Sequence, residues 1–316
     1  MRIKYIDALK GFAILLVIIG HICPSGIWIS LIYSFHMALF YFLSGLVVTY
    51  KICFTEFIYK KFRTLLLPFI SFVILHSFFF NLSISDILFD NVKDGLWFIY
   101  VLFFTQLIDY TCFKISLSKS EVTYLFLNII IVLLLVVVKE FSPAKVSSLF
   151  SLSYLATNYP FYFLGRICKR LNNMKNLSSE QTYSIIQFTA TASFFIIWGL
   201  SPYYIPNNEF SNMYLRLSGT ISLVMIFKQF NRTKLLDFFS IFGKETLAIY
   251  LLHFFFIRGI ANDMQYFNQV SPFIQILICI ILSIIIATVC IISAHIIKSN
   301  KYTSFILLGI KKLSIK

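Results

Sequence analysis

About ten long apolar segments run through this 316-residue chain, and they constrain its fold more than any other feature. An α-helix needs about 20 apolar residues to cross the hydrocarbon core of a bilayer. Segments close to this length cover residues 8–24, 27–50, 64–80, 95–112, 122–138, 147–168, 182–200, 211–230, 243–260 and 272–297. They predict an all-α polytopic membrane protein with about ten transmembrane helices.

Composition supports this class and argues against an ordinary soluble domain. Hydrophobic residues make up 59% of the chain, whereas soluble domains are about 45–50% apolar. The net charge of +14 could suit a nucleic-acid-binding protein, but the basic residues occur in short clusters between the apolar segments. Such clusters mark the cytoplasmic loops of membrane proteins. We therefore expect membrane lipid, and no nucleic acid, as a partner.

The distribution of lysine and arginine orients the predicted helices. With the N-terminus inside, 22 of the 27 basic residues fall on the inner side. The five others are Lys93, Lys139, Lys145, Arg216 and Arg258. Because basic residues concentrate in cytoplasmic loops, both termini are predicted to be cytoplasmic.

No loop is long enough to hold a soluble domain, so residues 1–316 are predicted to form a single membrane domain. The tail 304–316 mixes apolar residues with three lysines and is too short to span a membrane. We expect it to lie along the inner interface as an amphipathic segment. The six cysteines lie far apart without a Cys-x-x-Cys pair, which indicates neither a disulfide framework nor a metal site.

Three polar residues share one face of the first predicted helix. Asp7 and Lys10 lie near its start, and His21 follows eleven residues after Lys10. Eleven residues advance an α-helix by about 16 Å and about three turns, so Lys10 and His21 face one way. Ionisable groups inside a bilayer are costly and mark functional sites. We predict that Lys10 lies at the cytoplasmic face, that His21 lies near mid-membrane, and that the three residues carry the chemistry.

Two further histidines are predicted at a similar depth. His36 lies about nine residues into the second segment, and His253 lies about ten residues from the inner end of the ninth. Each either lines a site with His21 or hydrogen-bonds a neighbouring helix. Arg216 either contacts a polar substrate or extends to the interface. The two remaining histidines are interpreted as structural: His76 and His295.

The basic run Lys60-Lys61-Phe62-Arg63 allows two interpretations. It could simply mark the cytoplasmic side, as lysine and arginine do in many membrane proteins. Alternatively it could hold phosphates, with arginine as a bidentate fork and lysine as a point charge. The sequence contains no Gly-rich phosphate loop, no His-Glu-x-x-His and no Gly-x-Ser-x-Gly.

Five short motifs occur in a characteristic order. They are Ile6-Asp7-Ala8-Leu9-Lys10-Gly11 with Gly20-His21, Ser34-Phe35-His36-Met37 through Leu43-Ser44-Gly45, Lys60-x-x-Arg63 before Leu67-Pro68, Gly95-Leu96-Trp97-Phe98, and Gly243 through Tyr250-Leu251-Leu252-His253. Together they closely resemble the acyltransferase-3 family of integral membrane acyltransferases. The resemblance covers nearly the whole chain, although Ala38 stands where proline often follows the His-Met pair.

The resemblance implies O-acetylation of a bacterial surface glycan, such as O-antigen, capsule or exopolysaccharide, or of a lipid-linked oligosaccharide, at the inner membrane. Acetyl-CoA or another acyl-CoA would be the co-substrate, with no bound cofactor. The family's basic residue, ten residues and essential histidine map onto Lys10 and His21, and its Arg-x-x-Arg maps onto Lys60 and Arg63. Tyr250, His253, His36 and Arg216 are candidates for the acceptor side.

Another class of protein remains open from the residues alone. A transporter or flippase for a lipid-linked sugar could use the same histidines as proton relays. A third interpretation is that the chain has no activity of its own and serves as a structural partner in the membrane. Neither periodicity nor spacing reports the oligomeric state.

Overall fold

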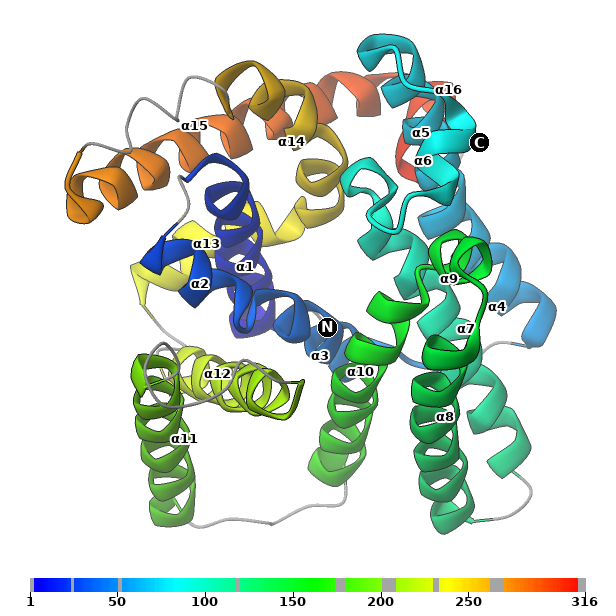
Figure 1. Ribbon diagram of the computed structural model, residues 1–316, viewed down its shortest axis with the longest axis vertical. Coiled ribbons are helices and arrows are strands. Elements are labelled where there is room, and N and C mark those ends of the chain that lie inside the picture. The colour runs from blue at the N-terminus through cyan, green and yellow to red at the C-terminus, as the bar shows by residue number, and fades with distance from the viewer. Residues whose placement is uncertain are drawn as a thin grey trace, which may run out of the picture. The chain divides into compact units, whose positions relative to one another are not determined.

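The computed structural model describes residues 3–23, 26–50, 53–117, 120–173, 180–200, 209–229, 233–261 and 270–311. Within these residues the chain is helical, without strands (Figure 1). In the first half the elements are α1 (Lys4–Ile22), α2 (Ile27–Tyr33), α3 (His36–Val47), α4 (Phe54–Lys61), the π-helical turn η1 (Phe62–Leu66), α5 (Leu67–Phe80), α6 (Ile84–Phe89), the 3-10 turn η2 (Lys93–Gly95), α7 (Trp97–Ser116) and α8 (Glu121–Phe141). In the second half they are α9 (Ala144–Phe150), α10 (Leu152–Asn173), α11 (Glu180–Leu200), α12 (Glu209–Gln229), α13 (Lys234–Lys244), α14 (Thr246–Ala261), α15 (Pro272–Ser299) and α16 (Lys301–Leu308).

Six helical stretches among the described residues are long and apolar enough to cross a membrane. They are residues 4–22, 27–47, 54–80, 97–116, 121–141 and 272–299. The other four predicted spans also lie on helices, namely α10, α11, α12 and α14, but these are less apolar or have shorter apolar parts. The chain is therefore an all-helical membrane protein, while the count of ten spans and the sides of the termini stay predictions.

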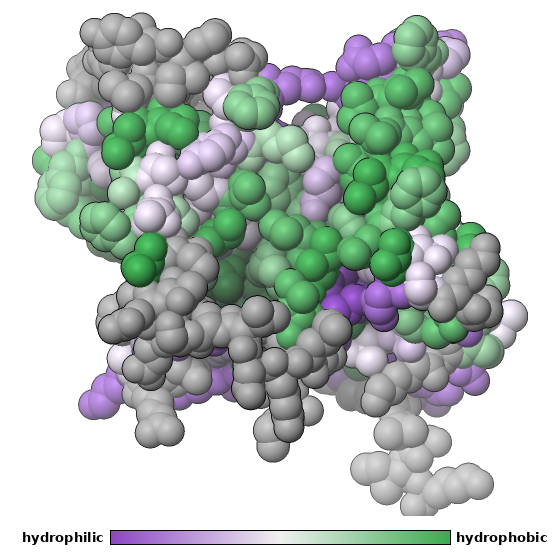
Figure 2. All heavy atoms as spheres, turned by 90° about the horizontal axis from the view of Figure 1, so that it is seen from below, coloured by the Kyte–Doolittle hydropathy of each residue, from purple (hydrophilic) through white to green (hydrophobic). Residues whose placement is uncertain are grey.

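Apolar side chains are exposed on many of these helices. Figure 2 shows green, apolar residues over much of the face that it displays, with purple residues in smaller groups. Phe78, Phe126 and Phe141 are 77%, 61% and 84% exposed. Exposed aromatic groups on this scale would be unfavourable in water and are suited to lipid.

The described residues divide into two compact units. The first contains Met1–Leu46 and Ile167–Ala294, and the second contains Val47–Arg166 and His295–Lys316. The prediction of one membrane domain stays a prediction. Of the predicted interfacial tail, residues 312–316 lie outside the described residues, and α16 ends at Leu308.

In the first unit, α1 lies directly against α13 (Figure 1). Two glycines make this close approach possible. A Cβ atom on Gly11 would lie 1.8 Å from the carbonyl oxygen of Phe239, and one on Gly243 would lie 1.7 Å from that of Asp7. Neither position has room for a side chain, so the two backbones are in contact. The same α1 also packs against α14, the helix that follows α13.

The second predicted span is interrupted in the structure. Helix α2 ends at Tyr33 and α3 begins at His36. The Ser34 hydroxyl donates a hydrogen bond of 2.7 Å to the Leu31 carbonyl oxygen, and serine side chains that bond locally compete with a continuous helix. His36 therefore occupies the start of a helix.

In the second unit, aromatic rings fill the contacts around α7. Phe57 of α4 stacks on Tyr110 of α7, with ring centroids 4.0 Å apart and planes 9° apart. Helix α16 packs against α5, where the Ser71 hydroxyl lies 3.0 Å from the Ile306 carbonyl oxygen. Between α4 and α5 the backbone widens into η1, which contains Arg63.

We expect Gly11→Ala or Gly243→Ala to lower the free energy of unfolding by about 1–3 kcal/mol, because a methyl group has no space at either position. Thermal unfolding of the purified protein in detergent measures the effect. Gly199→Ala is the matched control, since Gly199 is also helical and has nothing within 4 Å of its Cβ position. Equal unfolding temperatures for the Gly11 and Gly199 variants would contradict the contact.

Candidate active site

Helix α1 carries Asp7, Lys10 and His21 along one continuous helix, as the spacing predicts. His21 lies in its last turn and is exposed, whereas Asp7 and Lys10 are half-buried near its start. At the helical rise, His21 stands about 16 Å along the axis from Lys10. The helix thus separates a charged end from a histidine end.

Helix α14 brings His253 against His21. Their ring centroids are 5.5 Å apart, and the Phe254 ring packs against both, 4.8 Å from His21 and 4.3 Å from His253. His253 is fully buried. Tyr250, one helical turn earlier, has its ring centroid 5.8 Å from that of His253. The sequence predicts these residues at one depth, and Phe254 is a neighbour that sequence reasoning missed.

The start of α3 adds His36 to this group. Its ring centroid is 5.2 Å from that of Tyr33, and the Tyr33 hydroxyl donates to the Gly20 carbonyl oxygen at 2.8 Å, next to His21. His21 and Arg216 both lie within electrostatic range of the buried His36 ring. The structure therefore brings the three histidines and Arg216 into one region of the first unit. No sequence pattern pointed to Tyr33.

The ring nitrogens of the three histidines have different partners. His36 Nδ1 donates to the Ile32 carbonyl oxygen at 2.7 Å, and His253 Nδ1 donates to the Tyr250 carbonyl oxygen at 2.6 Å. Each bond places the proton on Nδ1 and leaves Nε2 as the acceptor nitrogen. Within the described residues, neither ring nitrogen of His21 has a hydrogen-bond partner. His21 is thus exposed, and both of its ring nitrogens are available to a ligand.

Arg216 lies on α12 and is half-buried. It makes no hydrogen bond or ion pair with another residue in the described part of the chain. Its guanidinium could thus contact an anionic or polar ligand through several donors. Arg216 therefore fits both interpretations drawn from the sequence, a contact with a polar substrate and an extension to the membrane interface.

The predicted donor residues belong to the second unit. Lys60 lies in the last turn of α4 and is exposed, while Arg63 lies in the π-helical turn η1. Lys61, between them, extends over the Phe57 ring at 5.6 Å. Single π-helical turns inside α-helices occur frequently at functional sites. The Nε atom of Arg63 is buried and has no hydrogen-bond partner among the described residues.

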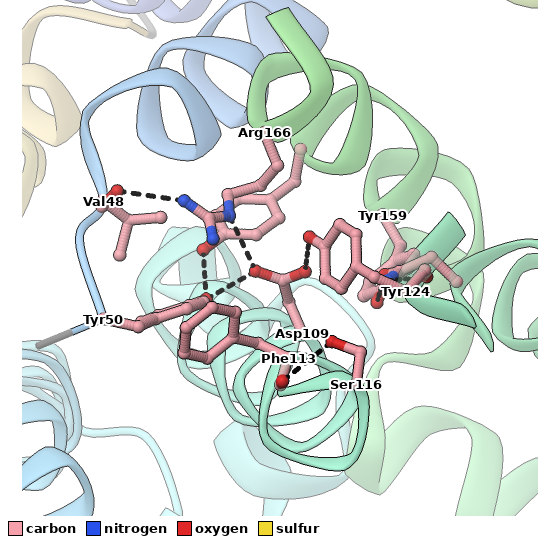
Figure 3. A network of polar contacts seen from close by, with 10 residues as sticks. Val48, Tyr50, Asp109, Phe113, Ser116, Tyr124, Tyr159 and Arg166 are labelled. Atoms are coloured by element: carbon pink, nitrogen blue, oxygen red, sulfur yellow. Dashed lines mark hydrogen bonds and ion pairs between the residues drawn. The ribbon is translucent and has the colours of Figure 1, made fainter. Parts of the chain in front are cut away.

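A buried polar network in the second unit was not predicted (Figure 3). Its centre is an ion pair between Asp109 of α7 and Arg166 of α10, with Nε and Oδ2 3.1 Å apart and side chains 0% and 6% exposed. Tyr50 donates to the same Oδ2 at 2.6 Å, and Tyr124 donates to Oδ1. The Tyr50 and Tyr162 hydroxyls are 2.9 Å apart.

The network also holds the chain that follows α3. Arg166 Nη1 donates to the Val48 carbonyl oxygen at 3.1 Å, and its guanidinium carbon lies 4.5 Å from the Tyr50 ring centroid. Sequence reasoning grouped Arg166 with the basic residues of an inner loop, because one cation near a predicted helix end carries no sign of its partner. Asp109 stands alone in an apolar segment, and this was the available signal.

Lys93 in the turn before Trp97, and His76 of α5, each bond to a group in that region of the second unit. Lys93 is buried, and its Nζ donates to the carbonyl oxygens of Leu88, Asp90 and Ser148 at 2.7–2.8 Å. His76 Nδ1 donates to Asp94 Oδ2 at 2.7 Å. The sequence gave no sign of a partner for His76, because Asp94 lies 18 residues further along the chain, in a turn. These bonds fit structural roles for both.

The first unit thus combines apolar helices with a group of three histidines, His21, His36 and His253. Within the described residues, no group of three His, Cys, Asp or Glu side chains could hold a metal ion. Residues 3–292 match the acyltransferase-3 family model, which is described as an acyltransferase domain. The chain belongs to this family, and membership indicates an acyltransferase. Comparison with curated proteins and with solved structures found no match.

Removing the carboxylate of Asp109 should destabilise the second unit strongly. Asp109→Asn leaves the Arg166 charge buried without its counter-ion, so we expect the free energy of unfolding to fall by about 3–5 kcal/mol. The double replacement Asp109→Leu and Arg166→Met should cost less, because no buried charge is left unpaired. Thermal unfolding in detergent measures both, with the exposed Asp86→Asn as control. A single variant as stable as the control would contradict the network's role.

Proposed function

We propose that this membrane acyltransferase moves an acetyl group from cytoplasmic acetyl-CoA to a sugar hydroxyl of a surface polysaccharide or lipid-linked oligosaccharide. The observation that supports it best is His21. It is exposed, its ring nitrogens have no hydrogen-bond partner among the described residues, and two further histidines lie near it. A family of acyltransferases provides the reaction class.

The reaction requires an activated hydroxyl. A sugar hydroxyl is a poor nucleophile at neutral pH, and a neutral imidazole can accept its proton. The hydroxyl oxygen then attacks the thioester carbonyl carbon, the C–S bond breaks, and the CoA thiolate leaves and takes up the proton. Alternatively the imidazole carries the acetyl group transiently before the hydroxyl receives it. Both routes need an accessible and uncommitted ring nitrogen, which His21 has.

The residues around His21 have supporting roles in this proposal. Phe254 and His253 fix one side of the ring at 4.8 and 5.5 Å between centroids. His36, Tyr250 and Arg216 line the acceptor side, where donors can stabilise the oxyanion of the tetrahedral intermediate. Lys10 and Asp7, about 16 Å along α1 from His21, form the charged end of the helix, which we assign to the cytoplasmic side.

Lys60 and Arg63 bind the phosphates of the donor in this proposal. Three features support this role: the exposed Lys60, the π-helical turn that displays Arg63, and the buried, uncommitted Arg63 Nε. Arginine binds phosphate through a planar fork and lysine as a point charge. With both termini cytoplasmic, as the basic residues predict, Lys60 and Arg63 face the compartment that holds acyl-CoA.

Replacing His21 tests the proposal. We expect His21→Ala to lose at least a hundredfold in transfer of radiolabel from acetyl-CoA to surface glycan, in line with the loss of an acid–base group. His295→Ala is the control, since His295 is an exposed histidine of α15 far along the chain from the site. Wild-type transfer by a correctly inserted His21→Ala protein would refute the assignment. Glycan translocation without consumption of acetyl-CoA would favour a flippase.

A further inference from the structure

Helix α16 lies outside the residues that match the family model, which end at 292. In the second unit it packs against α5, the helix that continues from η1. The Ser71 hydroxyl of α5 lies within hydrogen-bond distance of two carbonyl oxygens, Leu67 of its own helix at 2.9 Å and Ile306 of α16 at 3.0 Å. This extension therefore contacts the segment that carries Arg63.

The contact is closest where α16 ends. Gly309 has a left-handed backbone with φ 64°, and a Cβ atom there would lie 2.1 Å from the Arg63 carbonyl oxygen and 2.9 Å from Thr64 Cα. Only glycine fits both the conformation and the space. The backbone after α16 is thus pressed against the π-helical turn at Arg63 itself.

The chain leaves α16 in a fixed direction. Gly309 N donates to the Phe305 carbonyl oxygen at 2.9 Å, and Ile310 N donates to that of Ser304 at 3.1 Å. The first of these bonds is the single bond of the αL cap, which ends many helices at a glycine. Lys311 follows Ile310 and is exposed. Two residues span at most about 7 Å, so the Lys311 side chain extends from the neighbourhood of Arg63.

We propose that Lys311 is a third cation of the donor site and that α16 positions it there. Coenzyme A carries a diphosphate and a separate 3′-phosphate, so a site for it needs more than one cation. Lys60 and Arg63 lie within one helical turn of each other, and Lys311 adds a charge from the segment that follows Gly309. This inference rests on the proposed donor role of Lys60 and Arg63.

Binding of acetyl-CoA to the purified full chain tests the proposal. In phosphatidylcholine nanodiscs, Lys311→Gln should raise the Kd for acetyl-CoA about threefold, the size expected for an exposed charge pair. Its Kd should also depend less on salt concentration. The control is Lys301→Gln, an exposed lysine at the opposite end of the same helix. Equal affinities for the two variants would overturn the proposal.

A second variant tests the positioning by α16. Gly309→Ala must displace either η1 or the end of α16, so it should also weaken acetyl-CoA binding, and adding Lys311→Gln should then have little further effect. Gly26→Ala is the matched control, because Gly26 also has a positive φ but nothing within 4 Å of its Cβ position. Full additivity of the Gly309 and Lys311 changes would contradict positioning through this contact.

Two further arms separate the possible failures. If Arg63→Gln and Lys60→Gln weaken acetyl-CoA binding but Lys311→Gln does not, only the present inference fails. If none of the three changes the Kd, the proposed donor site itself fails. Phosphate groups also occur in anionic lipids, so nanodiscs with phosphatidylglycerol are compared: an effect of Lys311→Gln on lipid association alone, with unchanged acetyl-CoA affinity, would overturn the assignment to the donor.

Discussion

The backbone contact between α1 and α13 is the interaction on which the candidate active site depends. Gly11 and Gly243 allow the two helices to touch, and no other residue would fit at either position. Ten residues after each glycine stands a histidine, His21 on α1 and His253 on α14. The rings of these two histidines are neighbours. The glycine contact at one end and the histidine contact at the other thus hold the two chain segments in register.

This arrangement gives the equal spacing of glycine and histidine on the two segments a physical reason. Glycine in the middle of a helix costs stability, and at Gly11 and Gly243 the close contact between backbones offsets this cost. Here that contact is helix packing close enough to place an imidazole beside an imidazole. Lys10 and Asp7 belong to the same segment, so the glycine contact lies between the charged and the histidine ends of α1.

The helical class and the histidine group were predictable because they depend on local features. Segment length predicts a membrane helix, and residue spacing along a helix predicts depth. The break at Ser34 and the π-helical turn at Arg63 were not predictable, since both are small departures from a regular helix that no residue pattern marks. The pairing of Asp109 with Arg166 joins residues 57 positions apart through tertiary packing, which no local pattern reports.

The most direct test is whether His21 and His253 act as one unit. Transfer of label from acetyl-CoA to glycan is measured for the wild type, His21→Ala, His253→Ala and the double variant. Residues that act together are strongly non-additive, so the double variant should transfer label no more slowly than His21→Ala alone. Losses that multiply in the double variant would show that the two histidines act independently and would contradict the account.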